Sequence, residues 1–259
     1  MVKPAYVKLS HDPTPLEMLA DWAAGGTPGN WAPNKEYKAA FTRLTDLMNL
    51  YKCAIMETET RLKVLNARFS LEKERNPISS ISSRLKTPES IYEKVHRANI
   101  KPGIDELIEN MHDIAGLRVV CSFVEDVYQL VDCLERQDDI KILRRRDYIA
   151  NPKPNGYRSL HLIVMIPVFL PEGAVDMKVE IQLRTIAMES WASLEHKLRY
   201  KKDMDPELLQ SISKELSQCA QLSSRLDTRM QTIRYMIDGF DALDEAAIMK
   251  QYESEDIEL

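Results

Sequence analysis

Apolar residues recur at alternating spacings of four and three along two long stretches of the chain, one in its first third and one in its last. In residues 34–73 the recurring positions are Leu44, Met48, Tyr51, Ile55, Thr58, Leu62, Leu65 and Phe69. In residues 206–240 they are Ile212, Leu216, Cys219, Leu222, Leu226, Met230, Ile233 and Ile237. This spacing puts one apolar stripe along one side of a long helix. Each stripe needs a cover, and packing within the chain and contact with a second copy are equally open at this point.

The region between these two helices predicts a sheet with helices around it. Residues 175–184 alternate strictly between apolar and polar side chains, which is the period of a strand with one polar face. Further strands are expected at residues 78–86, 114–121, 140–149 and 160–168, and helices at residues 88–98, 124–136 and 185–200. The predicted fold class is therefore α+β, with a mixed sheet of four to five strands flanked by helices and a long helix near each end.

Composition narrows the class of protein without choosing one. The 259 residues are enough for a full core, and the net charge of -5 argues against binding nucleic acid over the whole surface. The four cysteines stand far apart, and no run of roughly 18 apolar residues occurs. We therefore expect a cytoplasmic protein that does not enter a membrane. Residues 1–33, rich in Pro, Gly and Asn, are expected to hold one short helix at residues 16–24, and the tail from Glu253 is acidic.

The segment that most clearly suggests a ligand is residues 147–161, where a Pro/Asn/Gly loop leads into an apolar strand. Two prolines stiffen the loop and an Asn-Gly pair turns it, so it can present Lys153 and Tyr157 to a planar or anionic group. His161 follows at the start of the strand and is the best candidate for a functional histidine. The loop alone does not say which ligand it binds.

Two acidic positions stand out beside this loop. Asp113 precedes an expected strand, and Glu180 shares the polar face of residues 175–184 with Gln182 and Arg184. Taken alone, an Asp at such a place is most often a turn former, and a polar strand face is most often solvated. Taken together, the two carboxylates could hold Mg²⁺, which prefers few carboxylates, several waters and the phosphates of its substrate.

Basic residues form a third group upstream. Lys94 and Arg97 lie one turn apart on an expected helix, and Arg84 and Lys86 share a face of the extended segment before it. A solvated basic face is the ordinary interpretation, and a clamp for polyphosphate is the functional one, because Arg binds phosphate oxygens in pairs and Lys acts as a point charge. The chain contains no Gly-x-x-x-x-Gly-Lys-Ser/Thr loop and no protein-kinase signature, which excludes those two kinds of ATP site.

These motifs, in this order and spacing, resemble the synthetase domain of the RelA/SpoT homology family. The match runs through residues 83–97, 113–118, 147–161 and 180–197. The length leaves no room for the hydrolase and regulatory domains of the larger members, so the resemblance is to a small alarmone synthetase. It implies a nucleotidyltransferase-like synthetase domain at residues 34–202, an N-terminal extension at residues 1–33, and a C-terminal helical oligomerisation segment with its tail at residues 203–259.

The resemblance also implies an activity, that of a GTP pyrophosphokinase of the stringent response. ATP would donate its β,γ-pyrophosphate to the 3′-hydroxyl of GTP or GDP with Mg²⁺ as cofactor, releasing AMP and forming (p)ppGpp. In the implied roles, Asp113 and Glu180 hold the metal, and His161 and Gln182 join them as catalytic residues. For ATP, the resemblance implies that Arg84 and Arg118 sandwich the adenine and that Lys86, Lys94 and Arg97 bind the phosphates. The implied acceptor-binding residues, with the tyrosine stacked on guanine, are Lys153, Asn155, Tyr157, Arg184, Arg144 and Arg146.

Several points stay open at the level of the sequence. Two ways of activating the 3′-hydroxyl are open. Either Asp113 acts as the general base, or the metal alone activates the hydroxyl. The family's homotetramer, built by terminal helices, favours oligomerisation as the cover for both stripes, and one branch of the family also binds pppGpp as an allosteric ligand and single-stranded RNA. The alternatives are a non-catalytic regulator with this fold that binds guanine nucleotide or RNA, and a nucleotidyltransferase. All the expected acids and bases are present, which argues against an inactive regulator.

Overall fold

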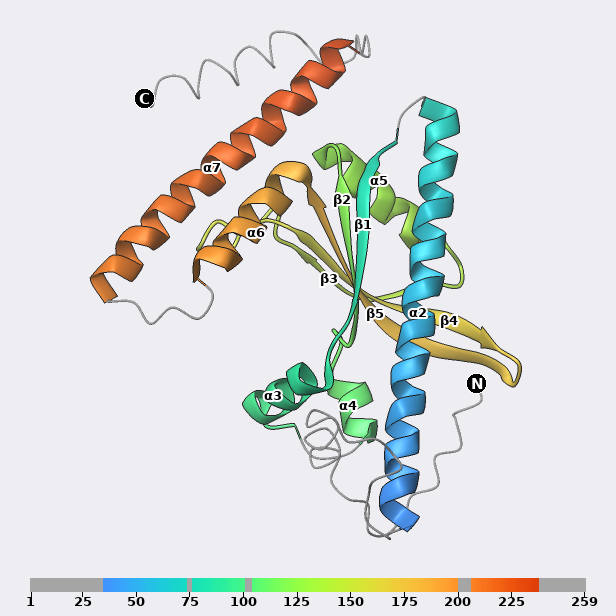
Figure 1. Cartoon of the computed structure of the whole chain (residues 1–259). Helices are drawn as coiled ribbons and strands as arrows, with labels where there is room; N and C mark the ends of the chain where they lie inside the picture. Colours follow the sequence, from blue (N-terminus) through green and yellow to red (C-terminus); the bar gives the residue numbers. More distant parts are fainter. Residues whose placement is uncertain (1–34, 74–75, 101–103, 200–205, 238–259) are drawn as a thin grey trace.

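The computed structural model describes residues 35–73, 76–100, 104–199 and 206–237, and Figure 1 shows how their helices and strands are arranged. Five of the described segments are strands of one sheet, namely β1 (Ile78–Leu85), β2 (Ala115–Cys121), β3 (Lys141–Asp147), β4 (Leu160–Leu170) and β5 (Gly173–Thr185). The helices are α2 (Lys35–Lys73), α3 (Pro88–Ala98), α4 (Ile104–Asn110), α5 (Val124–Glu135), α6 (Ile186–Arg199) and α7 (Pro206–Ile237). The expected helix at residues 16–24 and the acidic tail lie outside the described residues.

The sheet is mixed, and its last strand in sequence lies at its centre. The strand order is β1-β2-β5-β4-β3. β2 and β5 pair in parallel, whereas the other three neighbouring pairs are antiparallel. A two-residue connection ending at Gly173, whose φ is 130°, joins the long hairpin of β4 and β5. The predicted α+β class with a mixed sheet is confirmed.

One face of the central strands builds the core. Leu117 and Val119 of β2, and Ile181 and Leu183 of β5, are at most 2% exposed and belong to one cluster with buried side chains of α2 and α5. Burial of each such side chain is worth roughly 1.5–3 kcal/mol. Figure 1 shows α2 on one side of the strands, α6 and α7 on the other, and α5 behind β1. Because side chains alternate along a strand, the polar residues of β5 point away from this core.

The apolar stripe of α2 is covered by the chain itself. Leu44, Tyr51 and Leu62 are at most 1% exposed and pack in the core cluster. The interruption at Thr58 is also buried, and its hydroxyl donates to the carbonyl oxygen of Ala54 at 2.7 Å. The expectation that oligomerisation covers both stripes is therefore wrong for α2, because the apolar face of the sheet is already available to it.

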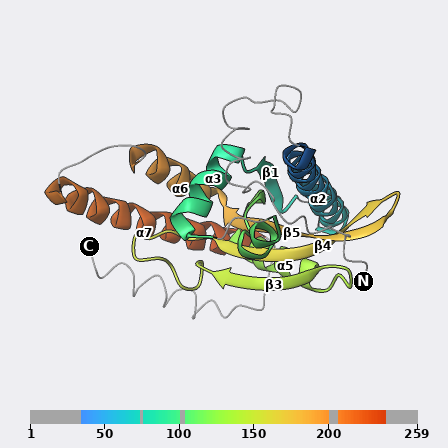
Figure 2. The same cartoon turned by 90° about the horizontal axis from the view of Figure 1, so that it is seen from below.

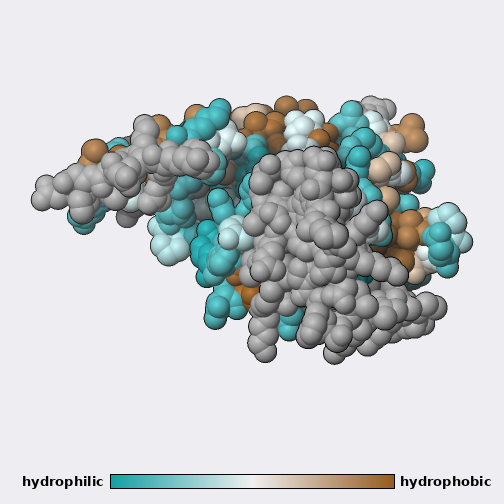
Figure 3. All heavy atoms as spheres, turned by 60° about the horizontal axis from the view of Figure 1, so that its bottom comes forward, coloured by the Kyte–Doolittle hydropathy of each residue, from teal (hydrophilic) through white to brown (hydrophobic). Residues whose placement is uncertain are grey.

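The apolar stripe of α7 behaves differently. Leu216 is buried, but Leu222, Leu226 and Ile237 are 64%, 53% and 78% exposed. Figure 2 shows α6 and α7 lying together away from α2, so α7 contacts the body along part of its length only. Figure 3 shows that apolar side chains also reach the surface at several separate places on the face that it presents.

No helix in the described ranges has the length and apolar character needed to cross a membrane.

Local sequence signals account for the start of α3, and their absence explains why α4 was not predicted. The Thr87 side chain accepts a hydrogen bond from the N–H of Ser90 at 3.3 Å, as expected of a helix cap. The helix ends at Asn99, whose φ of 50° is left-handed. By contrast, α4 has seven residues and buries only Leu107. A helix of two turns with one buried residue leaves no periodic pattern.

Candidate active site

Strand register collects the predicted polar residues on one face of the sheet. On β2 and β5, Gly116 lies opposite Glu180, and Arg118 lies opposite Gln182. On the other side of β5, His161 of β4 also pairs with Gln182. Of the polar residues of β5, Glu180 and Gln182 line a cavity, whereas Arg184 is only 5% exposed and lies beside them without lining it.

A first cavity of about 320 Å³ opens over β1, β2 and β5. Its basic lining residues are Arg84, Lys86 and Arg118, and its acidic ones are Asp113 and Glu180. β1 and β2 pair so that Arg84 faces Gly116 and Ser82 faces Arg118, which puts both arginines at the same cavity. Most of the residues predicted for ATP thus lie together.

A second cavity of about 220 Å³ lies next to the first, on the side of β3 and β4. Its lysine and arginine lining residues are Lys94, Arg144 and Arg146, and two histidines, His112 and His161, also line it. Asp113 and Glu180 line this cavity as well as the first. The two carboxylates therefore stand where two separately lined basic cavities meet, which is the arrangement required to bring two anionic substrates together.

Asp113 is held between two lysines. Lys86 Nζ donates to one carboxylate oxygen and Lys94 Nζ to the other, each at 2.6 Å. Burial would raise the pKa of Asp113, but the hydrogen bonds and charges of the two lysines outweigh it and lower the pKa below its usual value. The acid is therefore ionised at neutral pH, and the lysines predicted to bind phosphate supply its counter-charge.

Replacing Lys94 with Met should destabilise the protein by about 1 kcal/mol at neutral pH, because one of the two charged hydrogen bonds to Asp113 is lost. The folded-state pKa of Asp113 is depressed, so this stabilisation is complete above the unfolded pKa of about 4 and is lost as the pH falls through the folded value. Urea unfolding at fixed protein concentration, between about pH 7 and about pH 3, measures the difference between wild type and variant. Lys63→Met, at the exposed Glu59 pair of α2, is the matched control. A Lys94→Met difference that does not shrink in acid would contradict this account.

Glu180 is held by its neighbours on β4 and β5. Gln182 Nε2 donates to one carboxylate oxygen at 3.1 Å, and His161 Nδ1 lies 3.5 Å from the other. Burial would raise the pKa of Glu180, but the hydrogen bonds and charge of these neighbours lower it. The second carboxylate is therefore also ionised, at the bottom of both cavities.

The loop between β3 and β4 is ordered by side chains of the site. The Asn155 side-chain oxygen accepts from the N–H of Tyr157 at 3.2 Å, and Lys153 Nζ lies 4.8 Å from the centre of the tyrosine ring. The Tyr157 hydroxyl receives a hydrogen bond from Arg184 Nη2 at 2.6 Å and lies 2.8 Å from His161 Nε2. Asn155 therefore shapes the turn, a role that its prediction as a nucleotide ligand did not include.

The same loop is fixed to α7. A Cβ added at Gly156, whose φ is 86°, would collide with the Cβ of Ala220. Arg158 Nη1 and the Asp227 carboxylate, both largely buried, form an ion pair at 2.8 Å. Tyr157 packs in a small apolar cluster with Trp191 and Leu216. The C-terminal helix is therefore part of the support of the site.

Some functional residues could not be found from the sequence, and several predicted ones line neither cavity. Lys153, Asn155, Tyr157 and Arg184 belong to the β3–β4 loop or support it. Arg97 is exposed on α3 and lines neither cavity. Among the residues missed, His112 lines the second cavity, and its Nδ1 is buried without a hydrogen-bond partner in the described part of the chain. Glu189, on the first turn of α6, joins two arginines of the site. Neither position belongs to an alternating or helical pattern that would have singled it out.

The donor set suits a magnesium ion accompanied by phosphate. The described residues contain no group of three or more His, Cys, Asp and Glu side chains placed to hold a metal, whereas Asp113 and Glu180 face the same two cavities. Two carboxylates with water and phosphate oxygens are an ordinary set for Mg²⁺. The residues present therefore fit this ion only if the substrate brings further oxygens.

A mixed sheet whose polar face joins two basic cavities at a pair of carboxylates defines an enzyme that transfers a group between two phosphate-bearing substrates. Residues 83–205 match the family described as "Region found in RelA / SpoT proteins". GTP pyrophosphokinase YwaC of Bacillus subtilis is 41% identical over 189 residues, which cover 73% of this chain and 89% of that protein. The chain belongs to the RelA/SpoT family, as predicted.

Solved structures place the chain among the small members of this family. Small alarmone synthetase 1 from Bacillus subtilis bound to its product pppGpp is 36% identical, with a TM-score of 0.67, and the match covers 75% of this chain and 98% of that one. The same synthetase bound to AMPCPP is matched at 32% identity and a TM-score of 0.62, with coverage of 76% and 98%. The predicted likeness to a small alarmone synthetase is confirmed.

Proposed function

We propose that this protein is a GTP pyrophosphokinase that synthesises (p)ppGpp. It transfers the β,γ-pyrophosphate of ATP to the 3′-hydroxyl of GTP or GDP. The bond between the α-phosphate and the β-phosphorus breaks, a bond from the 3′-oxygen to the β-phosphorus forms, and AMP leaves. The observation that carries the proposal is the pair of adjoining basic cavities that share Asp113 and Glu180.

We assign the first cavity to ATP. Arg84 and Arg118 come from neighbouring strands and line the same space, where two guanidinium planes can stack on a purine. Lys86 and Lys94 reach into the junction of the cavities, where they can exchange the Asp113 carboxylate for phosphate oxygens. Arg97 is exposed on α3 and would contact the ATP phosphates only from outside the cavity.

We assign the second cavity and the loop above it to the acceptor nucleotide. Arg144 and Arg146 line this cavity and supply positive charge for the 5′-phosphates of the acceptor. Tyr157, in the loop above, offers its ring to guanine. Lys153 and Asn155 order the loop, while Arg184, His161 and Gln182 connect that loop to Glu180. Positioning and charge neutralisation are the main needs of such a transfer.

Asp113 and Glu180 would hold the Mg²⁺ that accompanies ATP, and the bound ion would neutralise charge on the transferred group. Because both carboxylates line both cavities, they also face the place where the acceptor 3′-oxygen would approach ATP. Asp113 is kept ionised by lysines, so it is available as a proton acceptor at neutral pH. Activation of the 3′-hydroxyl by the ion alone is the alternative that the same geometry permits.

The activity is tested by incubating the purified chain with ATP, Mg²⁺ and either GTP or GDP and separating the nucleotides. AMP and a guanosine penta- or tetraphosphate should appear in equal amounts, and the reaction should stop when EDTA removes the metal. Free pyrophosphate with AMP attached to an acceptor would identify a nucleotidyltransferase. Nucleotide binding without turnover would identify a non-catalytic regulator. Either of these two results would overturn the proposal.

Tyr157→Ala should raise the KM for the guanine nucleotide about tenfold and the KM for ATP much less, because stacking on a base is worth about 1–3 kcal/mol. Tyr157→Phe keeps the ring but removes the hydroxyl that contacts Arg184 and His161, and it is the matched comparison. Steady-state kinetics with each substrate varied in turn measures both constants. Equal increases for the two substrates in Tyr157→Ala would argue against stacking at this position.

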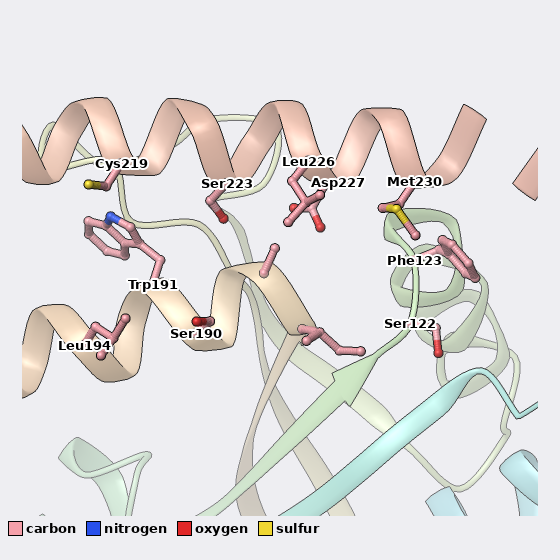
Figure 4. Close-up of a pocket in the computed structure, with 12 residues that line it drawn as sticks. Ser122, Phe123, Ser190, Trp191, Leu194, Cys219, Ser223, Leu226, Asp227 and Met230 are labelled. Carbon is pink, nitrogen blue, oxygen red and sulfur yellow. The ribbon is translucent and has the colours of Figure 1, made fainter. Parts of the chain in front are cut away.

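We further propose that α7 contributes to a homotetramer. Its exposed Leu222, Leu226, Met230 and Ile233 are continuous with the apolar cavity that Figure 4 shows between α6 and α7. One branch of the family binds pppGpp as an allosteric ligand and also binds single-stranded RNA. We propose that both would bind this protein at the surface between copies in such an assembly. Leu222→Glu with Leu226→Glu should lower the mass measured by light scattering, and an unchanged tetramer would contradict the assignment of α7.

A further inference from the structure

The carboxylate of Glu189 binds two arginines. Arg118 lines the cavity assigned to ATP, and Arg184 supports the loop assigned to the acceptor nucleotide. Its Oε1 accepts from Arg118 Nη1 at 2.9 Å, and its Oε2 accepts from Arg184 Nη1 at 2.7 Å. The hydroxyl of Ser193, one turn along α6, donates to Oε1 at 2.9 Å. Both oxygens of one side chain on the first turn of α6 are thus occupied by groups from strands β2 and β5 and from the helix itself.

On the side of the first cavity, Glu189 restrains a side chain that is otherwise free to move. Arg118 lines that cavity and its side chain is 45% exposed. A long exposed guanidinium loses considerable rotamer entropy when it settles against a ligand. A fixed carboxylate at one end of the guanidinium reduces this loss by holding the group in place beforehand.

On the side of the acceptor, Glu189 acts on a buried cation. Arg184 is only 5% exposed, and its Nη2 donates to the Tyr157 hydroxyl at 2.6 Å and to Gln182 Oε1 at 3.1 Å. Removal of the carboxylate would leave the guanidinium buried without a counter-charge, which is costly. The position of the Tyr157 hydroxyl, and of His161 beyond it, therefore depends on Glu189.

We propose that Glu189 is a positioning residue that couples the two nucleotide subsites, an inference that rests on the proposed function. The path runs from Arg118 through Glu189 and Arg184 to the Tyr157 hydroxyl. A nucleotide that contacts Arg118 in the first cavity further restrains Glu189 and Arg184, so the second nucleotide loses less side-chain freedom when it binds. Glu189 itself touches neither nucleotide in this scheme.

The test compares Glu189→Gln with two other variants. The amide keeps one oxygen acceptor but turns an N–H₂ group toward one of the two arginines, so the charge and one hydrogen bond are lost. Arg118→Ala removes only the arm that reaches the first cavity. Asp139→Asn is the matched control, because it breaks a two-bond arginine pair, 2.7 and 2.9 Å from Arg61, at residues that line neither cavity.

Two readouts separate coupling from general damage. The first is the KM for ATP and for GDP, which Glu189→Gln should raise about tenfold each, whereas Arg118→Ala should raise mainly that for ATP. The second is calorimetric binding of GDP with and without AMPCPP, whose α,β-methylene bridge prevents transfer. In the wild type AMPCPP should tighten GDP binding, and in Glu189→Gln the ratio of the two dissociation constants should fall to near one. Asp139→Asn should change neither readout.

The outcomes distinguish this inference from the proposed function. A wild-type protein that forms no AMP and no guanosine polyphosphate overturns the proposed function, while the GDP and AMPCPP binding ratio still tests Glu189. An active wild type with unchanged KM values and an unchanged binding ratio in Glu189→Gln overturns the coupling. Where Glu189→Gln fails to fold by circular dichroism, Glu189→Asp replaces it, since the shorter carboxylate can reach one arginine but not both. A wild-type KM for one nucleotide and a raised KM for the other in Glu189→Asp support the proposal. Wild-type KM values for both nucleotides overturn it.

Discussion

Glu180→Gln is expected to lower kcat about a thousandfold or more, with the fold intact. Glu180 lies where the two cavities meet, and its carboxylate is kept ionised by His161 and Gln182. Glu180 would hold the ion that neutralises charge on the transferred group, and loss of such charge stabilisation typically costs at least about a hundredfold. Asp113→Asn should have an effect of the same order, because it removes the second carboxylate of the same junction.

The matched control for Glu180→Gln lies on the same strand. Asp176 is two alternations earlier on the same polar side of β5, but it is exposed and lines neither cavity. Asp176→Asn should therefore retain nearly full activity. Turnover is measured by AMP release, and the fold by circular dichroism and thermal melting. Near-normal activity in both Glu180→Gln and Asp113→Asn would remove the basis for assigning the metal to these residues.

The second large effect is expected at Gly156, which lines neither cavity. A methyl group there would collide with the Cβ of Ala220 on α7, and the φ of 86° is itself costly for any residue but glycine. Gly156→Ala should therefore displace the loop that carries Lys153 and Tyr157. We expect the KM for the guanine nucleotide to rise about a hundredfold, while the KM for ATP changes much less.

A compensating substitution separates the two causes of that loss. Gly156→Ala combined with Ala220→Gly removes the collision but leaves the backbone cost, and the helix then pays about 1 kcal/mol for its own glycine. The double variant should recover part of the acceptor affinity. Ala220→Gly alone should have nearly normal kinetics. No recovery in the double variant would show that the contact between the loop and α7 is not what the substitution disturbs.

The sequence was sufficient where one element carries its own pattern. The alternation of β5 predicted both its buried face and its polar one, and the helix expected at residues 88–98 has the bounds of α3. The short α4 gave no such signal. The cover of the α2 stripe could not be decided either, because the same spacing suits packing on a sheet and packing on another helix.

The candidate site was predictable by residue but not by arrangement. The acids Asp113 and Glu180 were chosen correctly as neighbours, yet only the parallel pairing of β2 with β5 brings them together. Residues whose roles depend on a third partner were out of reach. Glu189 is useful because two arginines from different strands converge on it, and nothing in the local sequence around it reports that convergence.

The strand order has a consequence for how the protein is made. Of the strands in the described residues, β5 is the last to be synthesised, but it occupies the centre of the sheet and carries Glu180. While the ribosome is still upstream of β5, a growing chain has β1 and β2 without their central neighbour and β4 without its hairpin partner. Such a chain contains the lysines and Asp113 but lacks the second carboxylate. An incomplete chain is therefore not expected to make (p)ppGpp, because the site is complete only after β5 has inserted between β2 and β4.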